Sequence, residues 1–194
     1  MCTYGCLLLF FGIHNTVYDY LTAFETKWRI SLIIFIFSFL FPIASIFMLY
    51  RLRLIPSIAL SNQSDRTFPY ILTAVFYFGL FYLMLDINIL RVIKLSVAGA
   101  GLSILLTALI NLKSKISAHM VGIGGLLGVL ISVSHLIRFD MTFFYIGAIL
   151  LAGLLGFARM LLDEHKPAQI YSGFCLGLFV QTGLFFVLQK MIFI

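Results

Sequence analysis

The amino-acid sequence predicts an all-α fold, a polytopic transmembrane helical bundle of six to seven spans. Of the 194 residues, 62% are hydrophobic and only 10% are charged, whereas globular domains carry roughly 25% charged residues. The charged residues also stand between long apolar stretches, and a membrane-spanning helix needs about 20 mostly apolar residues. This composition excludes a soluble enzyme, a disordered chain and a disulfide-rich secreted module.

Seven apolar windows give the expected spans. The first is short, and the second contains Pro42, where we expect a kink that neighbouring helices accommodate. A polar loop, residues 51–68, should follow, with Pro69 starting the third span. Strands are not expected, because an open sheet edge leaves backbone groups unsatisfied in lipid. The windows are residues 3–18, 30–50, 69–85, 95–112, 117–137, 141–159 and 167–189.

Three connections between the expected spans are rich in polar groups, namely residues 61–69, 113–119 and 159–169. Two crossings separate the first connection from the second, and two more separate the second from the third. All three are therefore expected on one face of the membrane, whether or not residues 3–18 cross it.

Small residues spaced by four recur in the last three expected spans, and such pairs let helix backbones approach closely. We therefore expect these spans to pack together and to bring the second and third connections within reach of each other. The residues are Gly124–Gly128, Ala148–Ala152–Gly156 and Gly173–Gly177.

The third connection has the composition of a phosphate site. Arg159 offers a planar fork that binds phosphate oxygens in pairs. His165, six residues later, has a side chain that acts as a nucleophile, acid or base near neutral pH. Pro167 suits the first turn of the next helix, whose positive N-terminal end favours a bound anion.

The other two connections add to this pattern. The second places Ser117 and His119 at the mouth of the next span, with Lys115 upstream, and the first contributes Arg66. Two histidines, two arginines and a lysine at one membrane surface predict a phosphate site with its own nucleophile and acid. The net charge of +6 comes from scattered cations, which favours anionic lipid headgroups or a phosphorylated substrate over nucleic acid.

The third connection resembles the third motif of the type 2 phosphatidic acid phosphatase superfamily, the membrane lipid phosphatases related to vanadium haloperoxidases. That motif reads Ser-Arg, five residues, His, three residues, Asp. The present chain has Ala158-Arg159, His165 and Gln169 at those positions, followed by Gly173 and Gly177. The resemblance is to a small bacterial branch of the family, with glutamine in place of the aspartate.

The other two motifs are also present in altered form. The second, Pro-Ser-Gly-His, corresponds to residues 116–119, with Ser117 and His119 matching. The first, Lys, six residues, Arg-Pro, is represented by Arg66, with Ala59 at the lysine position and Pro69 displaced. The resemblance covers about residues 66–177. It implies a single transmembrane domain over residues 1–194, with N-terminal spans in 3–50 and a phosphatase-like core over about 61–190.

The resemblance also implies roles for individual residues. His165 would attack the substrate phosphorus and form a phosphohistidine, and His119 would protonate the leaving group. Arg159 and Arg66 would hold the phosphoryl oxygens with help from Ser117. No metal or cofactor is needed, because cations stabilise the charge that a metal ion stabilises elsewhere.

Two departures from the family pattern affect this expectation. Gln169 accepts a hydrogen bond from the nucleophilic imidazole but brings no charge, and an amide in place of an orienting aspartate cost about 10⁴-fold in a serine protease. Lys115 is the candidate to replace the phosphate contact of the lysine absent at Ala59.

The sequence therefore predicts an integral membrane phosphatase acting on a lipid phosphate or diphosphate. Its partners would be that lipid substrate and membrane lipids, in a bacterial inner membrane with the site on the periplasmic face. One alternative is a catalytically impaired member that binds lipid headgroups or has a structural role, and another is a small transporter using intramembrane histidines. The oligomeric state does not follow from the sequence.

Overall fold

The protein is an integral membrane protein built from a bundle of helices. The computed structural model describes residues 24–58, 60, 62–87, 91–137 and 140–192, and the expected span at residues 3–18 lies outside the described residues. Within that part every regular element is helical, and six helices are long and apolar enough to cross a membrane. The predicted all-α transmembrane bundle is confirmed. The elements are α3 (Phe24–Phe35), the π-helical turn η1 (Ile36–Leu40), α4 (Phe41–Arg51), α5 (Gln63–Met84), α6 (Arg91–Asn111), α7 (Ala118–Ile137), α8 (Thr142–Leu161) and α9 (Pro167–Ile192).

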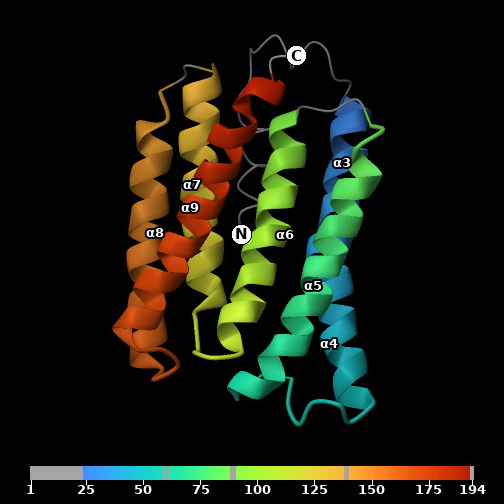
Figure 1. Cartoon of the computed structure of the whole chain (residues 1–194), viewed down its shortest axis with the longest axis vertical. Helices are drawn as coiled ribbons and strands as arrows, with labels where there is room; N and C mark the ends of the chain where they lie inside the picture. Colours follow the sequence, from blue (N-terminus) through green and yellow to red (C-terminus); the bar gives the residue numbers. More distant parts are fainter. Residues whose placement is uncertain (1–23, 59, 61, 88–90, 138–139, 193–194) are drawn as a thin grey trace.

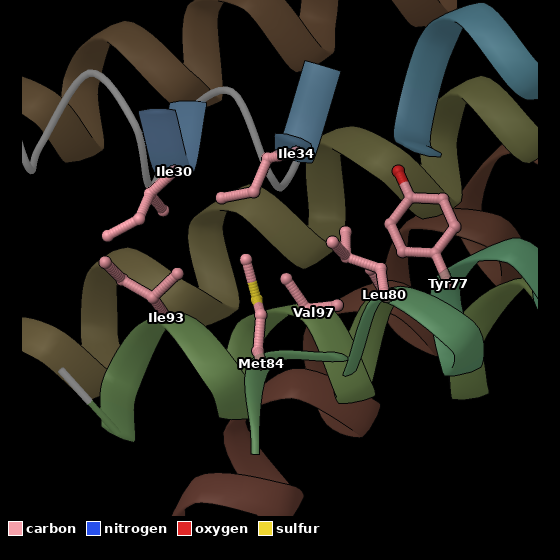
Figure 2. Close-up of a cluster of buried hydrophobic side chains, with 8 residues drawn as sticks. Ile30, Ile34, Tyr77, Leu80, Met84, Ile93 and Val97 are labelled. Carbon is pink, nitrogen blue, oxygen red and sulfur yellow. The ribbon is translucent and has the colours of Figure 1, made fainter. Parts of the chain in front are cut away.

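Helix α6 lies between two groups of helices: α3, α4 and α5 on one side, and α7, α8 and α9 on the other (Figure 1). Helices α3 and α5 of the first group share a cluster of buried apolar side chains with α6 (Figure 2). Because lipid tails are as apolar as these side chains, close packing rather than removal from water holds such helices together. The labelled members of the cluster are Ile30, Ile34, Tyr77, Leu80, Met84, Ile93 and Val97.

Helices α7 and α9 are in backbone contact through glycines. A Cβ atom added at Gly124 would collide with the backbone carbonyl of Phe174, and one added at Gly177 would collide with that of Val121. Helix α8 joins them through the small residue Ala148, which is buried against α7 side chains. The predicted packing of these three spans is confirmed.

Alanine at Gly124 is expected to destabilise the protein, because its Cβ has no room against the carbonyl of Phe174. Overpacking of this kind typically costs about 1–3 kcal/mol. Gly153→Ala is the matched control, since nothing lies within 4 Å of the added Cβ. Thermal unfolding of the purified protein should show a lower midpoint for Gly124→Ala alone. Equal midpoints for the two variants would contradict the close approach of α7 and α9.

Pro42 and Pro69 differ in their effect on the helices that contain them. Before Pro42 the helix widens into the π-helical turn η1, which fits the loss of a backbone N–H at a proline. The expectation that Pro69 starts a span is wrong, because α5 begins at Gln63 and contains Pro69 in its interior. The apolar window marked the membrane-buried part, while the helix extends into polar sequence, where Asp65 complements the positive end of the helix dipole.

A buried amide also connects the two halves of the bundle. Gln181 of α9 is fully buried, and its Nε2 donates to the carbonyl of Ser96 on α6 at 3.0 Å. Any Cβ at Gly99 would collide with the Gln181 side chain. The glycine therefore makes room for an interhelical hydrogen bond inside the membrane-spanning part.

Candidate functional site

The three polar connections lie at one end of the bundle, the lower end in Figure 1. Arg66 of α5 and Lys115 of the α6–α7 connection both approach Glu164 of the α8–α9 connection. Arg66 Nη2 lies 3.1 Å from Glu164 Oε2, and Lys115 Nζ lies 3.9 Å from the same oxygen. The predicted convergence of the three connections is confirmed, and the residue that joins them, Glu164, has no counterpart in the motif pattern.

Arg66 is a buried cation, 7% exposed, held from two sides. Its Nε donates to the carbonyl of Leu60 at 2.5 Å, and its Nη2 donates to Glu164. Leu60 has a φ of 52°, in the left-handed region that leucine rarely adopts. Tyr70, one turn further along α5, is also hydrogen-bonded to the guanidinium. The guanidinium is thus fixed in place before any ligand arrives, as electrostatic stabilisation of a charged group requires.

The turn that ends α8 places the next two site residues. The N–H of Asp163 donates to Met160 and that of Glu164 donates to Arg159, at 3.0 and 3.2 Å, and Asp163 has a φ of 51°. These are the two hydrogen bonds of a Schellman motif, with aspartate at the left-handed position that glycine usually takes. The turn brings Glu164 and His165 back over the end of the helix, where the N–H of His165 also points at the carbonyl of Arg159, at 3.4 Å.

His165 is buried, 8% exposed, and its ring is oriented by Gln169. Nδ1 lies 3.2 Å from Gln169 Oε1, and that oxygen also accepts the backbone N–H of Lys166 at 3.1 Å. Because an N–H donor already points at this amide atom, it is the oxygen, and Nδ1 must carry the proton of the contact. The lone pair that a nucleophile needs therefore lies on Nε2.

The surroundings keep His165 neutral. Burial lowers the pKa of His165 below its ordinary range, the hydrogen bond to Gln169 partly opposes this, and the charges of Arg66 and Lys115 lower the pKa further. Glu164 acts in the opposite direction. The imidazole is consequently in its uncharged, nucleophilic form at neutral pH.

Glu164 is a site residue that the sequence did not reveal. The hydrogen bond from Arg66 holds the pKa of Glu164 below its usual range, so the side chain is ionised at neutral pH. Its carboxylate oxygen lies between Arg66 and Lys115, where the oxygen of a bound anion would make the same charge-assisted contacts. The one signal in the sequence was its position next to His165.

His119 and Arg159 lie on neighbouring elements of the same site. His119 is the second residue of α7, its side chain is exposed, and Arg159, His165 and Arg66 are within electrostatic range of it. Arg159 is half-buried in the last turn of α8, where a cation also complements the helix dipole. The exposed ring of His119 is therefore the one open to an incoming ligand.

Ser117 lies directly before α7 and contributes through its backbone. Its N–H donates to the carbonyl of Gln169 at 3.3 Å, which joins the second connection to α9. The side chain is fully buried, and its Oγ has no hydrogen-bond partner in the described part of the chain. A phosphate at Arg66 would reach this hydroxyl only after the surrounding side chains shift.

The site therefore gathers three cations, two histidines and one carboxylate. No group of three or more His, Cys, Asp or Glu is placed to hold a metal ion among the described residues. Comparison with protein-family models, with curated proteins and with solved structures found no match. The chemistry of the site itself is the basis for the function proposed below.

Proposed function

We propose that this chain is an integral membrane phosphatase that hydrolyses a lipid phosphate or diphosphate through a phosphohistidine intermediate. The observation that carries the proposal is the neutral, oriented imidazole of His165 close to the fixed guanidinium of Arg66. A nucleophile beside a preorganised phosphate-binding cation is what in-line phosphoryl transfer requires. The resemblance of the three connections to the motifs of the type 2 phosphatidic acid phosphatase superfamily supports the same reaction.

In the first step the substrate phosphate replaces the Glu164 carboxylate on Arg66 and Lys115. Nε2 of His165 attacks phosphorus, the bond from phosphorus to the leaving oxygen breaks, and His119 gives that oxygen its proton. Arg66 and Arg159 hold the non-bridging oxygens as charge builds on them.

In the second step a water molecule attacks the phosphohistidine and His119 accepts its proton. The phosphorus–nitrogen bond breaks, inorganic phosphate leaves, and His165 returns to its neutral form. Throughout the cycle, Oε1 of Gln169 accepts a hydrogen bond from the protonated Nδ1 and keeps the ring in one tautomer.

The substrate class follows from the place of the site at the end of membrane-spanning helices. A phosphate held there belongs to an amphiphile whose apolar part stays in the bilayer. The membrane would be a bacterial inner membrane with the site on its periplasmic face. A cysteine at the exposed position Asn62 should then react with a membrane-impermeant maleimide from the periplasmic side. Labelling from the cytoplasmic side alone would show that the site faces the cytoplasm and would refute the periplasmic orientation.

The proposal is tested by phosphate release from a panel of lipid phosphates and diphosphates, measured with the purified protein. His119→Ala should lower kcat/KM by about 10²–10⁴-fold, the usual contribution of a positioned acid or base. His135→Ala is the matched control on the same helix, because His135 packs against Phe186 near the other end of α7. Equal activity of the two variants would refute the role of His119, and no release from any substrate would refute the phosphatase.

Gln169→Glu is expected to move the acid limb of the pH–rate profile to higher pH. His165 reacts only when neutral, so activity falls as the pH drops through its folded pKa, which lies below the ordinary histidine value. A carboxylate at position 169 would stabilise the imidazolium and raise that pKa. Gln169→Ala should move the limb the other way, because the hydrogen bond to Gln169 raises the pKa. Identical acid limbs in all three proteins would show that His165 is not the titrating nucleophile.

A second function, binding of a lipid phosphate headgroup without turnover, is favoured by two observations. Gln169 brings no charge to His165, and Glu164 already occupies the position between Arg66 and Lys115. Binding of a short-chain phosphonate without phosphate release from any lipid phosphate would establish this second function in place of the first.

A further inference from the structure

A cavity of about 300 Å³ extends from the site into the membrane-spanning part of the bundle. Leu60 and His119 line it at the site end, and Tyr77 and Ala100 line it deeper, with walls from α5, α6 and α7. His119 is therefore a shared wall residue of the phosphate site and of this cavity.

The surface of the cavity wall is mostly apolar, although several of the residues that line it have polar side chains. The hydroxyls of Thr73 and Thr107 donate to the carbonyls of Pro69 and Ser103 in their own helices, at 2.8 and 2.7 Å. They need no partner in the cavity. Ser103 differs from these two threonines, because it is buried and its Oγ has no hydrogen-bond partner in the described part of the chain.

The size and depth of the cavity limit what it holds. Ser103 lies eight residues from Asn111, the last residue of α6, which is about 12 Å at 1.5 Å per residue. A volume of 300 Å³ is at the lower end of ligand sites and holds about ten groups of water size, at about 30 Å³ each. That is room for one slender chain and not for two.

An apolar cavity in a membrane protein favours filling by a chain. Wall atoms beside an empty space lose their dispersion contacts, and a chain that enters restores them. The cation cluster at the mouth selects which chain enters, because it attracts an anionic headgroup.

We propose that this cavity binds a single hydrocarbon chain, of about ten carbons within the cavity, whose phosphate headgroup lies at Arg66 and His119. The inference rests on the proposed function for its headgroup and adds the substrate class: lipid phosphates with one slender chain. A two-chain lipid would have to leave its second chain in the bilayer.

The test uses the full chain in phosphatidylcholine nanodiscs and a ten-carbon alkylphosphonate with a photoreactive diazirine near the chain end. After irradiation, labelled peptides are mapped by mass spectrometry. Label should concentrate on the cavity walls around Thr73, Tyr77 and Ser103, at least tenfold above the lipid-exposed face of α8 around Leu150 and Leu154. Even labelling of both regions would overturn the proposal.

Variants of the wall provide an independent arm. Ser103→Leu and Thr73→Leu fill the cavity from two different helices and should each lower the cavity label at least tenfold. Leu109→Phe, on the exposed face of α6, is the control and should leave the label unchanged. If the cavity walls of Ser103→Leu and Thr73→Leu are both labelled as strongly as those of the wild type, the chain binds elsewhere and the proposal is overturned.

Methylphosphonate, which has the headgroup but no long chain, separates this inference from the proposed function. In excess it should displace the cavity label. Label that stays in the cavity despite methylphosphonate would refute the phosphate site and keep the chain site. Methylphosphonate binding without cavity label would keep the phosphate site and refute the chain site.

Discussion

Replacing His165 by alanine is expected to abolish phosphate release, with a loss in kcat/KM on the order of 10⁴-fold or more, as for other covalent nucleophiles. The imidazole is buried, neutral and oriented, so no neighbouring group takes its place. His119 is exposed on another helix, and in the proposed mechanism it protonates the leaving group instead. The rate of phosphate release from a single-chain lipid phosphate measures the effect.

Two further measurements distinguish loss of the nucleophile from loss of the folded structure in His165→Ala. Lys166→Ala removes an exposed cation next to His165 and should keep wild-type activity. Acid-labile phosphate trapped on the protein during turnover should be found on the wild type and be absent from His165→Ala. Release by His165→Ala close to the wild-type rate would mean that another residue attacks phosphorus.

The architecture followed from the sequence because it depends on composition along the chain. Lipid demands about 20 apolar residues per helix, so apolar windows located the six described spans, and counting crossings placed Arg66, Lys115 and His165 at one end. Small residues spaced by four identified the contact of α7 with α9, where Gly124 and Gly177 allow backbone contact.

Other features depend on side chains that meet only in the folded chain. Hydropathy shows which residues lie in the hydrocarbon region, but not where a helix begins. The apolar window therefore predicted the start of α5 at Pro69, six residues after its actual start at Gln63. Glu164 meets Arg66 across 98 positions of sequence, and Gln181 meets Ser96 across 85. Neither pairing has a local pattern. The cavity likewise forms only where five helices meet, namely α4, α5, α6, α7 and α9.

Glu164 gives the site a resting state in which no buried cation is left unpaired. An isolated buried guanidinium would be costly, and the carboxylate offsets that cost by a charge-assisted hydrogen bond. The same contact competes with substrate, since phosphate and carboxylate need the same donors. Glu164→Gln should therefore lower KM for a lipid phosphate and the inhibition constant for inorganic phosphate.

Arg66→Lys is expected to lower kcat/KM by about 10²–10³-fold, the range seen when one preorganised donor to a developing charge is removed. Lysine keeps the positive charge but loses the planar fork. One ammonium cannot reproduce the fixed geometry in which Nε is held by Leu60 while Nη2 meets the anion. Steady-state kinetics on a single-chain lipid phosphate would measure the loss. Arg53→Lys, at an exposed position of the α4–α5 connection, is the control and should leave kcat/KM unchanged.

The two substitutions together decide what Arg66 does. If Arg66 only pairs with Glu164, then Glu164→Gln should be at least as damaging as Arg66→Lys, because glutamine removes one charge of that ion pair while lysine keeps the other. If Arg66 holds phosphate, Arg66→Lys should lose activity while Glu164→Gln keeps it with a lower KM. The double variant should then resemble Arg66→Lys, since freeing the site from its carboxylate gives no benefit once the guanidinium that binds phosphate is gone.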